Sequence, residues 1–385
     1  MNRRAFLRHS ATAAAGAFGA LRLAPLAIAA GRPHAGAQSA APGAWDMASR
    51  KLLVIDGCGA INAQDVPLKP QILREALDSG VTAVNWTVSE PDFEATVGNI
   101  AFVQSLVDSD PAHFCVIRRH ADIARAAEDR SIGVILGFQH PGPIEPDLAR
   151  LEMFRGLDVL IMQLTYNNRG LYGDGCLEPA NAGLSKLGRA AVERMNTLGI
   201  AVDLSHCGQR TTAEGIQASK KPVLITHAGC AAVHPHPRNK DDRELKALAE
   251  RGGVIGIYFM PYLVASPITP AREHVLAHLD HALRVAGTEH VGIGSDGSLN
   301  TVLDTPEQRK RIQDDMARRQ KLGIAAPEED RPPFCPDLNT PRRLEIIADG
   351  LAKQGYSAGV IEGVLGKNFA RALGEIWQAP VAHTS

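Results

Sequence analysis

Short apolar runs alternate with amphipathic stretches along most of the chain. Between residues 52 and 296, eight runs of mostly apolar residues are predicted as strands, each followed by a stretch with helical spacing. The predicted strands are residues 52–56, 82–87, 132–138, 159–164, 200–204, 223–226, 254–259 and 290–296. Strand–helix alternation with near-continuous apolar strands favours a (β/α)8 barrel, an α/β fold of the TIM-barrel type, over a doubly wound sheet.

The stretches between the strands carry the helical signals. The clearest is residues 185–198, where Leu187, Ala191 and Met195 recur at helical spacing with charged residues opposite. Further helices are expected at residues 70–78, 92–108, 122–129, 148–154, 211–219, 241–251 and 271–286. The charged stretch 305–331 is expected to form an exposed helix and loop, and residues 342–354 and 357–378 to form C-terminal helices. A single barrel domain is therefore expected over residues 51–378.

The first fifty residues have a different character. Arg3 and Arg4 precede Phe6 and Leu7, and an Ala/Gly/Leu-rich run follows. This pattern is typical of a twin-arginine export signal, here over residues 1–30, followed by an Ala/Gly/Pro/Ser-rich linker over residues 31–50. A retained transmembrane anchor is the alternative, but the run is a poor permanent span because arginine and proline interrupt it. We therefore expect export by the twin-arginine machinery to the periplasm, with no membrane anchor after cleavage.

Composition narrows the class of protein. The 385 residues are 45% hydrophobic and 22% charged, with a formal net charge of −1, which is typical of a soluble globular protein. There is no basic surplus to bind nucleic acid. The six cysteines contain no C-x-x-C pair and so predict neither a zinc ribbon nor a disulfide scaffold, although some thiols could pair in an oxidising compartment. The sequence leaves the oligomeric state open, and a homodimer is compatible with it.

Polar residues that can do chemistry follow the predicted strands, at the end where barrel enzymes hold their sites. Two apolar runs end close to His206 and His227 and are joined by a predicted crossover helix, so both imidazoles should face the same end of the barrel. With Asp296 on the eighth strand, they match the ligand preferences of Zn²⁺. A carboxylate beside the ion can take a proton from an attacking water. Arg238, in a proline-bracketed loop, can bind a substrate carboxylate, although a surface salt bridge would explain it equally well.

These segments resemble the membrane dipeptidase (renal dipeptidase) family. The similarity rests on V-D-L-S-H at residues 202–206, T-H at 226–227, H-P-R-N at 236–239 and V-G-I-G-S-D at 291–296, and it extends from about residue 53 to 369. The resemblance implies a (β/α)8 metallopeptidase that cleaves dipeptides with two bridged zinc ions. It also implies that His206 and His227 bind the second metal, that Asp296 is the base, and that Arg238 holds the terminal carboxylate of the substrate.

The chain departs from the family pattern at the first metal. The family's first strand ends in Asp-Gly-His-x-Asp, whereas this chain has Cys58 and Ala60 at the two ligand positions. The bridging glutamate falls on Gln139, and a substrate-contacting histidine falls on Tyr166. Cys58 could be a thiolate ligand or a small buried residue, Gln139 could offer a carbonyl oxygen, and Tyr166 could donate a hydrogen bond to an oxyanion or simply pack.

The balance between metal charge and anionic side chains then predicts one zinc ion rather than two. Two dications roughly 3.5 Å apart repel by several kcal/mol even at a high effective dielectric constant. Of the matched anionic side chains only Asp296 remains, so we expect one ion held by His206, His227, a water and either Asp296 or Cys58.

The predicted function is a metal-dependent dipeptidase-like hydrolase that cleaves a dipeptide or a related small amide. Two alternatives stay open: a catalytically inactive barrel that binds a peptide-like ligand, and a hydrolase of a non-peptide amide or lactone.

Overall fold

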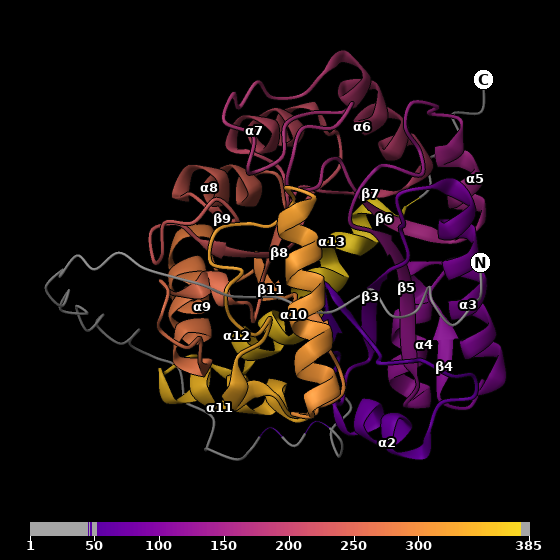
Figure 1. Ribbon diagram of the computed structural model, residues 1–385, viewed down its shortest axis with the longest axis vertical. Coiled ribbons are helices and arrows are strands. Elements are labelled where there is room, and N and C mark those ends of the chain that lie inside the picture. Colours follow the sequence, from indigo (N-terminus) through magenta and orange to yellow (C-terminus); the bar gives the residue numbers. More distant parts are fainter. Residues whose placement is uncertain (1–44, 46, 48–51, 379–385) are drawn as a thin grey trace, which may run out of the picture.

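The computed structural model describes residue 45, residue 47 and residues 52–378 (Figure 1). The predicted export signal lies outside the described residues, and so does the predicted linker apart from Trp45 and Met47. Among the helices that are described, none combines the length and the apolar character needed to cross a bilayer.

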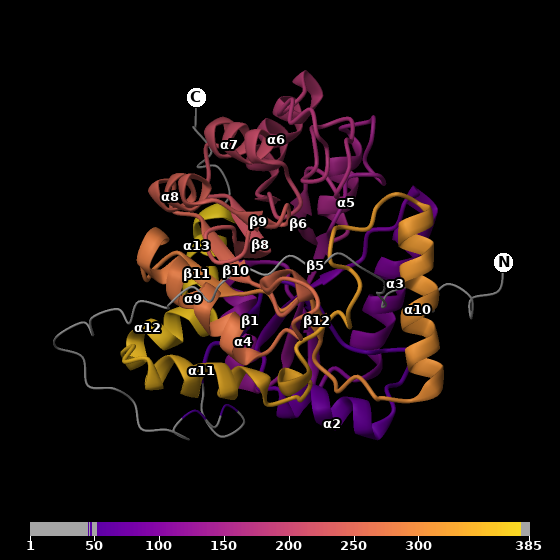
Figure 2. The same cartoon turned by 60° about the vertical axis from the view of Figure 1, so that its left-hand side comes forward.

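Eight parallel strands form a closed barrel surrounded by helices (Figures 1 and 2), as the apolar runs predicted. Neighbours pair in chain order, β10 joins β8, and β11 pairs with β1 to close the barrel. The strands are β1 (Ile55–Asp56), β3 (Ala83–Thr87), β5 (Ile132–Phe138), β6 (Val159–Gln163), β7 (Ala201–Asp203), β8 (Leu224–Cys230), β10 (Val254–Ile257) and β11 (Val291–Ile293). All carboxyl ends therefore meet at one end of the barrel.

Four further strands were not predicted, because two or three residues leave no periodic signal. Strand β4 (Phe114–Val116) pairs with β5, and β9 (Asn239–Lys240) pairs with β8. Strands β2 (Gly59–Ala60) and β12 (Gly297–Ser298) form a separate parallel pair. The β9 pairing corrects one predicted boundary: β8 continues to Cys230, so His227 lies within this strand and not after it.

Helices cover the outside of the barrel, close to the predicted positions. They are α2 (Pro70–Asp78), α3 (Phe93–Ser109), α4 (His120–Asp129), α5 (Arg150–Gly156), α6 (Lys186–Leu198), α7 (Gln209–Ala218), α8 (Asp242–Glu250) and α9 (Arg272–Ala286). Local chemistry sets several ends. The Ser185 side chain accepts a hydrogen bond from the Gly188 N–H at the start of α6, and Gly199 ends it in the left-handed region at φ 67°.

The C-terminal part of the chain adds the long helix α10 and the helix α13, whose side chains pack against the barrel strands. Helix α10 (Pro306–Lys321) stands in front of the strands in Figure 1 and at the side of the molecule in Figure 2. It is followed by α11 (Arg343–Lys353), α12 (Ala358–Glu362), a π-helical turn (Gly363–Lys367) and α13 (Asn368–Ile376). Phe369 and Leu373 of α13 join a buried cluster with strand residues such as Ile135 and Leu224, so side chains fill this interior.

Glycines at the strand ends allow close backbone approach, and this gives a first prediction. A Cβ at Gly294 would lie 1.7 Å from the Thr226 carbonyl oxygen, whereas one at the exposed Gly98 of α3 would meet nothing within 4 Å. Gly294→Ala should lower the free energy of unfolding by about 3 kcal/mol, because backbone must move. Gly98→Ala should raise it by up to about 1 kcal/mol through helix propensity. Urea unfolding of both variants checks this, and equal stabilities would contradict it.

Candidate metal centre

Two loops at the carboxyl end of the barrel bring Cys58 and Asp296 together. The pair β2 and β12 starts immediately after these residues, with Gly59 opposite Gly297. The Asp296 N–H also donates to the Cys58 carbonyl oxygen at 2.7 Å. Asp296 adopts a left-handed φ of 55°, a conformation that aspartate tolerates better than most residues. The backbone therefore fixes the thiol and the carboxylate side by side, with 3.6 Å between Sγ and Oδ1.

The buried carboxylate of Asp56 accepts hydrogen bonds from both of these loops. It accepts hydrogen bonds from the Ser295 N–H at 2.8 Å, from the Ser295 hydroxyl at 2.6 Å and from the Cys58 N–H at 3.3 Å. Arg343 lies 3.3 Å from the same carboxylate and compensates its charge. Burial raises the pKa of Asp56, and Arg343 opposes that shift. Asp56 thus acts as a positioning residue for the loops that carry Cys58 and Asp296.

The buried carboxylate of Asp203 positions the segments that carry the two histidines. Its carboxylate accepts from the hydroxyls of Ser205 at 2.5 Å and Thr226 at 2.6 Å, and from both backbone N–H groups. Ser205 Oγ in turn accepts from the His227 N–H at 3.1 Å. The end of β7 and the middle of β8 are therefore tied together at the residues that precede His206 and His227.

The hydrogen bonds of His206 and His227 define their tautomers. Asn167 donates a hydrogen bond through Nδ2 to the Ile324 carbonyl, so its Oδ1 faces His206 Nδ1 at 2.6 Å. Since an amide oxygen only accepts, His206 Nδ1 carries the proton and donates it to this oxygen. The Thr226 hydroxyl donates to Asp203, so its oxygen accepts from His227 Nδ1 at 2.9 Å. In the neutral rings both Nε2 atoms are therefore lone-pair acceptors, and they lie only 3.0 Å apart.

Two facing lone pairs need a cation between or beside them. A proton is disfavoured here: burial lowers the pKa of both histidines well below the usual range, and Arg238 lowers each further. A divalent cation can accept both lone pairs, and neutral imidazole is the form that binds metals. The histidine pair therefore fits a metal ion better than it fits protons.

Cys58 and Asp296 provide further ligand atoms at the same place. The Cys58 sulfur, a His227 nitrogen and an Asp296 oxygen all lie within 4.8 Å of one another, the one cluster of this kind that the described residues form. Burial raises the pKa of Asp296 to about 6, while Arg238 and hydrogen bonds from Cys58 and Gln139 oppose the shift. Nitrogen, sulfur and carboxylate donors match the preferences of zinc, so the residues present fit such an ion.

Gln139 enters the cluster differently from the sequence-based expectation of a carbonyl ligand. Its amide nitrogen donates to Cys58 Sγ at 3.0 Å and to Asp296 Oδ1 at 3.3 Å. Gln139 is therefore a hydrogen-bond donor to the two potential anions of the cluster in this structure.

Tyr166 stacks on His206 with ring centroids 4.3 Å apart. Its hydroxyl oxygen accepts a hydrogen bond at 2.9 Å from Arg319 of α10, which forms a two-point ion pair with Glu329. Burial raises the pKa of Tyr166, and Arg319 opposes the shift, so the phenol remains a donor. Because its oxygen is occupied by Arg319, the phenolic proton is available to another acceptor.

Arg238 is buried next to the histidines, 1% exposed, and not at the surface. Its Nη1 donates to the Ser205 carbonyl, and its Nη2 to the His227 carbonyl at 3.3 Å. Within the described part of the chain it forms no salt bridge. A guanidinium has five N–H donors, so this buried cation keeps donors and charge for an anion.

The sequence placed Asn167 among the polar residues after the fourth predicted strand without giving it a role, and it did not single out Asp203 or Arg319. Asn167 follows Tyr166 directly, and Asp203 stands two residues before Ser205, a spacing that allows a side chain to accept the i+2 N–H. Those local signals could have identified them. Arg319 lies in a uniformly charged helix, where no local pattern distinguishes it.

Asn167 gives a second prediction. Asn167→Ala should weaken metal binding by roughly 10- to 100-fold, because it removes the group that holds the His206 tautomer. Exposed Asn168 is the matched control, since it donates to the neighbouring Gly323 carbonyl but does not touch His206. Competition of each variant with a chelating dye measures the affinity. Equal affinities for the two variants would contradict the role of Asn167.

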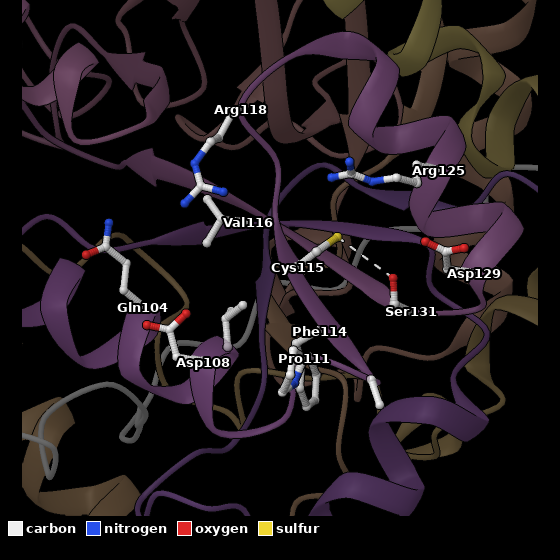
Figure 3. A pocket seen from close by; sticks show the side chains of 12 residues that line it. Gln104, Asp108, Pro111, Phe114, Cys115, Val116, Arg118, Arg125, Asp129 and Ser131 are labelled. Carbon is white, nitrogen blue, oxygen red and sulfur yellow. Dashed lines mark hydrogen bonds between the residues drawn. The ribbon is translucent and has the colours of Figure 1, made fainter.

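A surface pocket elsewhere is separate from this cluster. Figure 3 shows a cavity of about 710 Å³ lined by residues around Cys115, Arg118, Arg125 and Ser131 from β4, α4 and their neighbours. None of the metal-cluster residues lines it.

Comparison with known proteins identifies the family. The model of the membrane dipeptidase family (Peptidase family M19) matches residues 69–319. Dipeptidase tcpJ of Claviceps purpurea is 31% identical over 75% of this chain and 72% of its own length. Dipeptidase verJ of Clonostachys rogersoniana is 32% identical, but the match spans only 52% of each chain.

A solved structure is similar to this chain over a longer span. An amidohydrolase from Pseudomonas aeruginosa is 30% identical and superimposes with a TM-score of 0.74, covering 86% of this chain and 98% of that one. The family match covers more than half of the described barrel and includes both histidine strands, β7 and β8, and Arg238. The chain belongs to the membrane dipeptidase family, peptidase family M19, and so is classed with the dipeptidase-like hydrolases.

Proposed function

We propose that this protein hydrolyses a dipeptide or a related small amide with one zinc-like ion bound by His206 and His227. The observation that carries the proposal is the pair of lone-pair Nε2 atoms, which lie 3.0 Å apart. Asp296, the single carboxylate of the cluster, lies within 4.8 Å of the His227 ligand atom. Family membership supports the reaction class. When bound, the ion supplies Lewis acidity, which brings the pKa of water toward neutrality and polarises the scissile carbonyl.

Asp296 acts as the base in this proposal. Its carboxylate lies within 4.8 Å of the histidine ligand atom and is held by the Gln139 amide. It accepts the proton of the attacking water and returns it to the leaving amine.

Arg238 and Tyr166 bind the substrate. Arg238 offers unused N–H donors in a buried position, which suits the terminal carboxylate of a dipeptide. Tyr166 donates a hydrogen bond from its phenol to the oxyanion that develops on the carbonyl. Arg319 orients the phenol by donating a hydrogen bond to its oxygen.

The substitutions at Cys58 and Gln139 favour two other candidate functions that the same experiment tests. A barrel that only binds a peptide-like ligand would keep Arg238 without turnover, and an altered centre could instead hydrolyse a non-peptide amide or a lactone. The test is a panel of dipeptides, simple amides and lactones, assayed with the native protein, after chelation, and after zinc is added back. We expect dipeptide turnover that chelation abolishes and about one equivalent of zinc restores. A ligand-induced rise in melting temperature without turnover would support the binding-only function, and metal-dependent turnover of lactones alone would support the third.

We also propose export to the periplasm by the twin-arginine machinery, supported by Arg3 and Arg4 ahead of Phe6 and Leu7. Replacing both arginines with lysine should retain the protein in the cytoplasm. Cell fractionation of the two forms measures this, and periplasmic accumulation of the double variant would contradict it.

A further inference from the structure

We propose that Cys58 is a thiolate ligand of the single ion, so that the ion is held by two imidazoles and one thiolate while Asp296 stays free as the base. This inference rests on the proposed function, because it concerns the ion at the same histidines. It chooses Cys58 over Asp296 as the third protein ligand of the ion.

The position of the sulfur is fixed by its backbone. The Cys58 N–H donates to Asp56, and the Cys58 carbonyl accepts from the Asp296 N–H at 2.7 Å. The side chain is 4% exposed, and Sγ lies within 4.8 Å of the ligand atoms of His227 and Asp296. A buried thiol this close to the ligand nitrogen of His227, which itself lies 3.0 Å from His206 Nε2, is positioned for the metal and not for the solvent.

Gln139 supports an anionic sulfur. Its Nε2 donates to Cys58 Sγ at 3.0 Å. Without a metal, burial and the neighbouring Asp296 carboxylate raise the pKa of the Cys58 thiol, and the Gln139 hydrogen bond opposes that shift. A bound cation would therefore have to drive the loss of the thiol proton. A carboxylate at the position of Gln139 would instead repel a thiolate. Cys58 and Gln139 are therefore compatible with each other at one charged sulfur.

Charge favours the thiolate over a neutral thiol. A dication with two neutral imidazoles keeps two positive charges next to buried Arg238, and Asp296 alone offsets one of them. A thiolate offsets the second. On binding, the thiol releases its proton to solvent as the sulfur–metal bond forms. Three protein ligands also leave a coordination position open, as in catalytic rather than structural zinc sites.

Cobalt(II) titration of the metal-free protein tests the proposal without an activity assay. We expect about one equivalent to bind with a sulfur-to-cobalt charge-transfer band in the near ultraviolet. Cys58→Ser should lose that band and bind cobalt at least about 10-fold more weakly. Cys115→Ser, at a half-buried thiol on β4 outside the cluster, should keep both. Asp296→Asn should keep the band, because Asp296 is not the ligand.

X-ray absorption of the zinc-loaded wild type tests the same ligand without a variant. We expect one sulfur at about 2.3 Å from the zinc. One bound cobalt without the band, or a zinc shell without sulfur, overturns the role of Cys58 and leaves the proposed function intact. Two bound cobalt ions overturn the single-ion ligand set. No binding of either metal overturns both the thiolate and the proposed function.

Discussion

His206→Ala is expected to abolish metal binding and to lower kcat/KM for dipeptides by roughly a thousandfold or more. The variant removes one of two facing nitrogen ligands, and metal assistance is worth several kcal/mol of barrier, each 1.4 kcal/mol being a factor of ten. The change also removes the hydrogen bond between Asn167 Oδ1 and the His206 ring, and alanine has no nitrogen to replace the ligand. Steady-state kinetics and elemental analysis of the same preparation provide the two measurements.

The matched control for this variant is His113→Ala. His113 forms a partly exposed hydrogen bond with Asp110 beside β4, far in sequence from both histidine strands. It should retain the wild-type metal content and turnover. Wild-type turnover by the His206 variant would refute the assignment of the metal to this pair.

Arg238→Met is expected to cost about 2 to 5 kcal/mol in transition-state binding of a dipeptide, roughly a 30-fold to several-thousand-fold loss of kcat/KM. The reason is that a buried carboxylate would lose its charged, fork-shaped partner. Methionine keeps much of the volume, so the change tests charge and hydrogen bonding more than packing.

A substrate comparison separates this effect from a structural one. Arg238 also donates to the carbonyls of Ser205 and His227, so its loss could disturb the histidine strands. If the arginine binds the substrate carboxylate, the variant and the wild type should hydrolyse a dipeptide amide, which lacks that carboxylate, at similar rates. Equal losses on the free dipeptide and on its amide would show that Arg238 acts through the fold.

The barrel could be predicted from the sequence because its strands lie in mostly apolar runs, and most of their residues are buried. Ile132–Phe138, for example, is buried at every position. The extension of β8 to Cys230 could not be predicted, because it depends on the two-residue strand β9 from a loop that follows. Long-range pairing of such short segments leaves no local pattern.

The candidate site divides in the same way. His206, His227, Asp296, Cys58, Gln139, Arg238 and Tyr166 follow or lie in strands, and the structure brings them to the same end of the barrel. The orientation of the Gln139 amide and the ion pair behind Tyr166 depend on partners far away in the chain. Arg319, for instance, reaches Tyr166 from 153 residues later in the chain, and Glu329 holds Arg319 in turn.

The number of metal ions per chain tests the account most directly, because Asp296, the one carboxylate of the described metal cluster, cannot neutralise a bridged pair of dications. Elemental analysis of the natively purified protein should find about one zinc-like ion per chain, and His206→Ala should find none. Two ions per wild-type chain, or a single ion that persists in the His206 variant, would contradict it.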